Sequence, residues 1–361
     1  MNYKIEQLRI KIKEKKLDAF LVEDPTNVFY LSNFSGTTAT LLITLNHQYV
    51  LVDYRYVLQA QKECTDYQVI VYNQSFSQFV EKLNELIFQN NVHRLGFDGN
   101  KVTFNRVNEL KHHIESNILP VDLNDLRAIK TDQEIETLKQ AIAIGDEVFT
   151  KVYPKIKPGI KESDVVAMMY QQLKAMNATN FSFDAIVASG LRSSMPHGVA
   201  SSKVIEEDDI VTVDWGVVYN HYCSDCTRTF FMNKPTNEKL VDMYNVVLEA
   251  NIKTIEAVKA GVSTKEIDAI ARAVVAKYNY QDYFKHGTGH GLGIDIHEFP
   301  LLNPFTDVTL KENMVITIEP GIYIEGVGGV RIEDVVVVRK DGCEVLTKLN
   351  KELQYKTEGS K

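Results

Sequence analysis

The 361-residue sequence has few cysteines, no long hydrophobic run and no run of basic residues. Its four cysteines are too few for a disulfide framework, so a reducing compartment such as the cytoplasm is expected. No apolar stretch approaches the roughly 20 residues that cross a bilayer, and the charged N-terminal segment lacks the apolar centre of a signal peptide. The net charge of -8, without a basic run, disfavours nucleic acid as a partner.

Two of the cysteines, Cys223 and Cys226, form a C-x-x-C motif, which in isolation suggests a redox pair or half of a zinc site. The surrounding letters HYCSDCTRTFF are typical of a strand, in which residues three apart point to opposite faces. The sequence has no second C-x-x-C to complete a zinc cage. We therefore favour a structural role for both thiols.

Residues 1–126 alternate short apolar segments with helical patterns, which predicts an α/β domain. This part of the chain has no phosphate-binding loop and no cluster of acids or histidines, so we expect it to be architectural or to shape the substrate site. The predicted strands are residues 17–22, 40–45, 49–53, 67–72 and 94–98.

A second domain is expected over residues 127–361, beginning just before a long helix. Thr131 and Glu134 form a T-x-x-E capping box, and apolar residues then repeat on one helical face. Within this domain, IKPGIKESDVV (156–166) resembles VKAGVSTKEID (258–268) at an offset of 102 residues. If this repeat is structural, two similar α/β halves face one another across a cleft.

The segment KHGTGHGLGIDIHEFP contains three histidines, His286, His290 and His297, among four glycines. A single histidine is most often structural, but three of them at spacings of four and seven, separated by glycine, favour a site. The glycines do not fit the dinucleotide-binding fingerprint, because its third glycine falls on Leu292.

The segment IVTVDWGVVYNHYCSDCTRTFF predicts two apolar strands joined by a two-residue hairpin loop at Tyr219 and Asn220. With Val218 and His221 as the closing pair, the register is fixed along both strands.

That register places Asp214 directly opposite Asp225 on one face of the sheet. Like charges directly opposite one another on a sheet are destabilising unless a positive charge lies between them. A solvated hairpin with two unrelated acids is the alternative, but an acid inside so apolar a strand is costly unless it is paired or ligated.

Two further acids lie in apolar strands. Glu319 ends MVITIEPGIYI just before a Pro-Gly pair, and Glu333 lies in GGVRIEDVVVV on the same face as Arg331. Glu333 could simply pair with Arg331 or lie on a solvated face. Together with His290 and the two aspartates, however, the set comprises four carboxylates and one imidazole. Such ligands suit Mn²⁺, Co²⁺ or Zn²⁺ and are too many for one closed zinc site, whereas two bridged ions roughly 3.5–4 Å apart would use them all.

The order Asp214, Asp225, His290, Glu319, Glu333 resembles the ligand set of the pita-bread metallopeptidases, the M24 type, which include methionine aminopeptidases, aminopeptidase P and prolidase. The motifs DWG, SDCTRT, HGTGHGLG, IEPGIYI and VRIED agree with it, and SGLRSSMPHGVAS resembles bacterial and archaeal Xaa-Pro peptidases. The resemblance implies an N-terminal α/β domain followed by an α+β pita-bread domain, with pseudo-twofold halves and a dinuclear metal cleft.

The resemblance also implies roles for residues that are not ligands. His286 would line the pocket for the substrate proline, and His297 would contact the substrate or steady the reacting centre. His197, in the letters PHG, would support the scissile carbonyl and the tetrahedral intermediate. Tyr323 and Arg331 would line the site near the metals and the proline pocket.

The expected reaction is metal-dependent, prolidase-like hydrolysis of Xaa-Pro bonds in dipeptides or short peptides. Two divalent ions are expected, Mn²⁺ first and Co²⁺ or Zn²⁺ as alternatives, with Glu319 carrying a proton as well as ligating. An Xaa-Pro aminopeptidase acting on longer peptides is the alternative. A creatinase-like relative without metals and a non-enzymatic binding module are disfavoured, because all five ligand positions are filled. The expected partners are small peptides with proline second and another copy of the chain in a homodimer, with no nucleic acid and no membrane.

Overall fold

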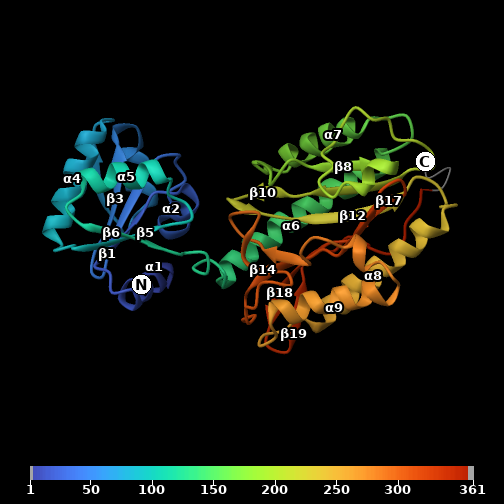
Figure 1. Cartoon of the computed structure of the whole chain (residues 1–361). Helices are drawn as coiled ribbons and strands as arrows, with labels where there is room; N and C mark the ends of the chain where they lie inside the picture. Colours follow the sequence, from blue (N-terminus) through green and yellow to red (C-terminus); the bar gives the residue numbers. More distant parts are fainter. Residues whose placement is uncertain (1–2, 357–361) are drawn as a thin grey trace. The chain divides into compact units, whose positions relative to one another are not determined.

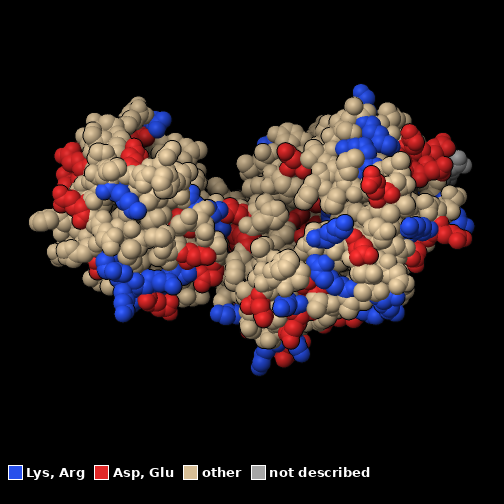
Figure 2. All heavy atoms as spheres, in the orientation of Figure 1, with Lys and Arg blue, Asp and Glu red and all other residues tan. Residues whose placement is uncertain are grey.

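The computed structural model describes residues 3–356 of the chain. The chain divides into two compact units, Met1–Leu126 and Arg127–Lys361, whose helices and strands are labelled in Figure 1. Acidic and basic side chains are interspersed over the face of each unit that Figure 2 shows. Among the described helices, none is both long and apolar enough to span a membrane.

The first unit is an α/β domain built on a six-stranded sheet of order β4-β3-β2-β1-β5-β6. Helices α4 and α5 bury apolar side chains against this sheet. All five predicted strands are present, and β6, which contains Pro120, was not predicted. β6 is an edge strand, where a residue without an N–H is tolerated. The elements of this unit are α1 Tyr3–Glu14, β1 Ala19–Val22, α2 Pro25–Ser32, β2 Thr40–Thr44, β3 Gln48–Asp53, α3 Val57–Glu63, β4 Gln68–Tyr72, α4 Phe76–Gln89, β5 Arg94–Asp98, α5 Phe104–His113 and β6 Asn117–Val121.

The second unit is an α+β domain in which small sheets are covered by two helix pairs. Its helices are α6 Asp132–Val152, α7 Glu162–Ala175, α8 Glu238–Ala257 and α9 Thr264–Lys277. Its strands are β7 Asn180–Phe181, β8 Ile186–Ser189, β9 Ile210–Trp215, β10 Val217–Tyr219, β11 Tyr222–Cys223, β12 Cys226–Phe231, β13 Gly289–Gly291, β14 Glu298–Leu302, β15 Val315–Ile318, β16 Gly321–Ile324, β17 Gly328–Arg331, β18 Asp334–Arg339 and β19 Gly342–Val345.

The two halves of this unit follow the internal repeat. Gly159 separates α6 from α7 and Gly261 separates α8 from α9, and both glycines have φ of 93°. α6 and α7 pack with β8, β9 and β12, whereas α8 and α9 pack with β16 and β17. Figure 1 shows α7 and the α8–α9 pair on opposite sides of the strands. The second unit therefore consists of two similar halves, as predicted, each with a helix pair packed on its own strands.

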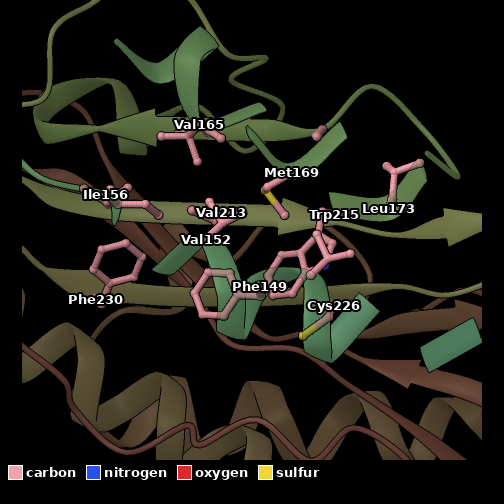
Figure 3. Packing of buried hydrophobic residues seen from close by; sticks show 14 of the residues in the cluster. Phe149, Val152, Ile156, Val165, Met169, Leu173, Val213, Trp215, Cys226 and Phe230 are labelled. Carbon is pink, nitrogen blue, oxygen red and sulfur yellow. The ribbon is translucent and has the colours of Figure 1, made fainter. Parts of the chain in front are cut away.

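The core of the first half fixes the direction of β9. The Trp215 ring stacks on Phe149 of α6, with ring centroids 4.6 Å apart, and its Nε1 donates to the Gly145 carbonyl at 3.0 Å (Figure 3). Because neighbouring side chains on a strand point to opposite faces, burial of Trp215 against α6 turns Asp214 to the other face.

The hairpin after β9 differs from the predicted one. Its two loop residues are Asn220 and His221, with φ of 46° and 69°, and Tyr219 pairs with Tyr222. A two-residue loop with positive φ at both positions matches the twist of the strands, and histidine tolerates that conformation better than most residues.

The corrected register places Asp214 opposite Thr227 rather than opposite Asp225. The prediction that the two aspartates lie directly opposite one another was therefore wrong by two residues. Because side chains alternate with a period of two, Asp225 still shares the face of Thr227 and is a diagonal neighbour of Asp214.

The C-x-x-C cysteines do not form a common site. The Sγ of Cys223 donates to the Ile294 carbonyl at 3.2 Å, whereas the Sγ of Cys226 donates to the Glu333 carbonyl at 3.8 Å. Both thiols are free and buried, and burial raises the pKa of each one. They are packing residues at the ends of neighbouring strands.

Gly216 provides a test of this packing, because a Cβ placed there would overlap the Ser224 carbonyl. We expect Gly216→Ala to lower the free energy of unfolding by about 3 kcal/mol, measured by urea denaturation of the metal-free protein. Gly342→Ala is the matched control, since a Cβ there meets open space and should cost no more than about 0.5 kcal/mol. Equal stability of the two variants would contradict the close approach of the Gly216 backbone to the Ser224 carbonyl.

Candidate metal centre

The residues singled out in the sequence line one cavity of about 470 Å³ in the second unit. They come from both helix-flanked halves. The lining includes His197, Asp214, Asp225, His286, His290, His297, Glu319, Tyr323, Arg331 and Glu333.

The ring of His290 presents a bare nitrogen to two acids. Its Nδ1 lies 3.0 Å from the Gly291 carbonyl, which can only accept, so Nδ1 carries the proton and Nε2 carries a lone pair. Nε2 lies 3.5 Å from Oδ2 of Asp225 and 3.3 Å from Oε1 of Glu319. One donor atom each from Asp225, His290 and Glu333 lies within 4.8 Å of the others. An unprotonated imidazole nitrogen and carboxylate oxygens that converge in this way are suitable ligands for a metal cation.

The carboxylates of this cluster carry more negative charge than the neighbouring protein groups neutralise. Burial, followed by repulsion from the neighbouring carboxylates, raises the pKa of Asp225 and of Glu333 well above their ordinary values. Burial also raises the pKa of Glu319 to about 7, against the opposing effect of Arg331. A divalent cation would offset both the cost of burying the charges and the repulsion among the carboxylates. This set of ligand atoms therefore fits a metal ion.

Asp214 is only partly satisfied by the protein. Its Oδ2 accepts from Nη2 of Arg331, whereas its Oδ1 is buried with no hydrogen-bond partner within residues 3–356. An unpaired buried carboxylate oxygen is costly, and a metal ion is a suitable partner for it.

Two threonines orient the acids and were not predicted. Thr227 donates to Oε2 of Glu333 at 2.8 Å, and Thr317 donates to Oε1 of Glu319 at 3.2 Å. Thr227 lies two residues after Asp225, and Thr317 lies two residues before Glu319. Strand alternation therefore placed both threonines on the ligand face, and this signal could have found them.

His286 and His297 are neutral imidazoles beside this cluster. Burial, together with Arg331, lowers the pKa of His286 to about 4. Its Nδ1 donates to the Gly287 carbonyl at 2.8 Å, its Nε2 is buried without a hydrogen-bond partner in the described chain, and its ring lies 5.5 Å from that of Tyr323. The ring of His297 meets His290 edge-on with centroids 4.4 Å apart, and burial followed by the effect of His290 lowers its pKa.

His197 lies on a loop, residues 189–201, that is held by a residue absent from the prediction. The buried carboxylate of Glu162 accepts from the backbone and side chain of both Ser189 and Ser201, and from Arg192. These partners lie 27 to 39 residues away, so no local pattern marked Glu162. Arg331 secures the same loop by donating to the Pro196 carbonyl at 3.1 Å.

Family models match most of the chain. Residues 136–340 match the model of metallopeptidase family M24, and residues 4–129 match that of the creatinase/prolidase N-terminal domain. The chain belongs to metallopeptidase family M24. The membership implies divalent metal ions, in agreement with the cluster around His290. The two-domain architecture, an α/β domain followed by a pita-bread domain, is the one predicted.

Relatives within the family cover nearly the whole chain. The Xaa-Pro dipeptidase of Pyrococcus furiosus is 39% identical over 98% of this chain and 100% of its own length. Among solved structures, the Xaa-Pro dipeptidase from Bacillus anthracis has a TM-score of 0.94 and 40% identity, covering 98% of this chain and 99% of its own. The X-Pro aminopeptidase from Thermotoga maritima has a TM-score of 0.88 and 33% identity, covering 97% and 99%.

Replacing one of the repelling acids should stabilise the metal-free M24 protein. We expect Asp225→Asn to raise the free energy of unfolding of the metal-free form by about 1 kcal/mol at pH 8, since one buried like charge is removed. Added Mn²⁺ should stabilise the unaltered protein but not this variant, as differential scanning calorimetry would report.

Asp334→Asn provides the contrast, because Asp334 is buried but paired with Arg228 and Lys351. This variant should lose roughly 3 kcal/mol of stability in the metal-free form. If Asp225→Asn lost a similar amount, the repulsion inferred among the cavity acids would be absent.

Proposed function

We propose that this protein is an Xaa-Pro dipeptidase that cleaves dipeptides with proline in the second position. The observation that carries the proposal is the bare Nε2 of His290 facing Asp225 and Glu319 inside a cavity large enough for a small peptide. The dipeptidase relatives that cover nearly the whole chain support this substrate class.

The metal ligands in this proposal are Asp214, Asp225, His290, Glu319 and Glu333. Four carboxylates and one imidazole suit two ions, and their hard oxygen atoms favour Mn²⁺ over Zn²⁺. When bound, the ions supply Lewis acidity toward the scissile carbonyl and make water nucleophilic at neutral pH.

The chain's own residues select the proline. An Xaa-Pro bond is a tertiary amide without an N–H, so the site needs shape rather than a hydrogen bond at that nitrogen. The neighbouring rings of His286 and Tyr323, tilted by 58° to each other, would offer a wall for the proline ring, and their neutral state keeps that wall uncharged. In our proposal these two rings hold the proline ring, and Arg331 fixes Tyr323 by donating to its hydroxyl.

Charge that develops on the carbonyl oxygen needs hydrogen-bond donors. His297 is neutral near pH 7 and keeps one N–H, and His197 lies at the same cavity. We assign both to stabilise the oxyanion. Glu319 would take a proton from the attacking water and deliver it to the proline nitrogen, which must be protonated to leave.

The remaining expectations are proposals of the same kind. The first unit would be architectural and shape the substrate site, and residues 127–361 would be the catalytic domain. A homodimer is proposed from the family resemblance, and sedimentation would measure it. An aminopeptidase acting on longer peptides is the alternative, and the similarity to the Thermotoga maritima enzyme keeps it in the test.

The substrate test compares peptides of two and three residues. With Mn²⁺ present, we expect kcat/KM for Ala-Pro to exceed that for Ala-Pro-Ala by about tenfold or more, and Ala-Ala to be a poor substrate; release of free amino acids is the measurement. Faster cleavage of Ala-Pro-Ala would identify an aminopeptidase instead. Turnover that survives a strong chelator and dialysis would exclude the proposed metal chemistry.

The histidines should separate by function. His290→Ala should lose both metal binding and activity. His197→Ala and His297→Ala should keep the metals and lose kcat by roughly 10²–10³-fold, the usual cost of deleting one preorganised donor. His286→Ala should mainly raise KM or weaken the preference for proline. Metal content and steady-state kinetics of the four variants test this division of roles. Loss of metal from His297→Ala would identify His297 as a ligand.

A further inference from the structure

Asn251, a fully buried residue of α8, joins the two backbone segments that carry the cavity glutamates. Its Nδ2 donates to the carbonyls of Ile318 and Ile332 at 3.0 and 3.3 Å. Ile318 directly precedes Glu319, and Ile332 directly precedes Glu333. Both N–H groups of one amide are therefore spent on backbone atoms adjacent to the two glutamates.

The strand pairing explains why a side chain is needed at this point. Gly321 pairs with Arg331 across β16 and β17, so the next pair toward the cavity is Pro320 with Ile332. Ile332 N–H donates to the Pro320 carbonyl at 3.5 Å, but Pro320 has no N–H to return. Asn251 supplies the hydrogen bond that the proline cannot give to the Ile332 carbonyl.

The same register places Glu319 opposite Glu333, as a pair of the antiparallel ladder that exchanges no backbone hydrogen bonds. Glu319 N–H donates to the Thr288 carbonyl at 2.8 Å, and Glu333 N–H donates to the Thr227 carbonyl at 3.2 Å. The N–H groups of the two glutamates point outward from the pair and reach different neighbouring segments, as the alternation of an antiparallel ladder requires. The Asn251 amide bridges the two segments beside this pair, where Pro320 leaves one ladder hydrogen bond unmade.

The amide itself is held by a charged network that does not line the cavity. Lys351 Nζ donates to Oδ1 of Asn251 at 2.7 Å and to Oδ2 of Asp334 at 2.7 Å. Asp334 Oδ1 accepts from Nη2 of Arg228 at 2.7 Å, and Nη1 of Arg228 donates to the Glu333 carbonyl at 2.6 Å. With Oδ1 fixed by a cation, the amide cannot flip without losing all three of its bonds.

We infer that Asn251 is a positioning residue for the metal centre: it sets the separation of the Glu319 and Glu333 backbones, and Lys351 fixes its orientation. The inference rests on the proposed role of these glutamates as metal ligands. Groups that orient metal ligands from behind typically contribute roughly 10–100-fold to metal affinity.

The test titrates Mn²⁺ into the metal-free protein by calorimetry and measures urea unfolding of the same metal-free samples. Asn251→Leu should weaken Mn²⁺ binding by roughly 10–100-fold, and at saturating metal kcat should fall more than KM rises. Thr254→Val is the matched control, since Thr254 lies one turn along α8, is fully buried, and its Oγ1 has no hydrogen-bond partner within residues 3–356. This control should bind Mn²⁺ like the unaltered protein.

A purely structural Asn251 would give a different result. Asn251→Leu would then unfold at lower urea yet bind Mn²⁺ within about twofold of the unaltered protein, and the inference would be overturned. If Asn251→Leu does not fold, Lys351→Met decides, because it frees the amide and leaves Asp334 paired with Arg228. It should weaken Mn²⁺ binding at least threefold, and unchanged binding would refute the inference.

Asp225→Asn distinguishes failure of this inference from failure of the proposed function. If Asp225→Asn abolishes Mn²⁺ binding and Asn251→Leu does not alter it, only the positioning role of Asn251 fails. If neither variant alters Mn²⁺ binding, the metal site itself is misassigned, and the inference falls with it.

Discussion

Repulsion among the four cavity carboxylates is the constraint on which the second unit depends. Asp214, Asp225, Glu319 and Glu333 line one cavity, and among the described residues a single guanidinium, that of Arg331, forms an ion pair with one of them, Asp214. Such a cluster cannot be held by attraction between its own members, so the backbone must impose it. The energy for this comes from the apolar cores between the helix pairs and the strands, which lie outside the cavity.

The division of the unit into two halves follows from this constraint. The first half contributes Asp214 and Asp225, and the second contributes His290, Glu319 and Glu333. Each half has its own helix pair and its own core, so each can offset the cost of holding its acids. In the cavity between the two halves, uncompensated negative charge is therefore most costly, and a cation is bound most favourably there. A divalent ion there replaces repulsion with attraction, which links metal binding to stability.

Much of this site could be predicted from the sequence, because acids in apolar strands and histidines between glycines are local signals. The elements that hold the site could not. Glu162 and Asn251 look like ordinary helix residues, and their partners lie 27 to 39 and 67 to 100 residues away. The missed strand β6 and the misplaced hairpin had local causes. β6 contains Pro120, and the predicted loop lay one residue too early, at Tyr219 and Asn220 instead of Asn220 and His221.

The hairpin error shows why the site prediction tolerated a wrong geometry. A slip of two residues moves each side chain along its own face, whereas a slip of one would have turned Asp225 away from Asp214. The contacts that orient the donors are also short-range. Nδ1 of His290 bonds the carbonyl of the next residue, and Thr317 bonds Glu319 two positions on. The chain thus builds donors whose orientation is set locally, and the long-range fold has only to bring them together, which is the part that Asn251 and Glu162 secure.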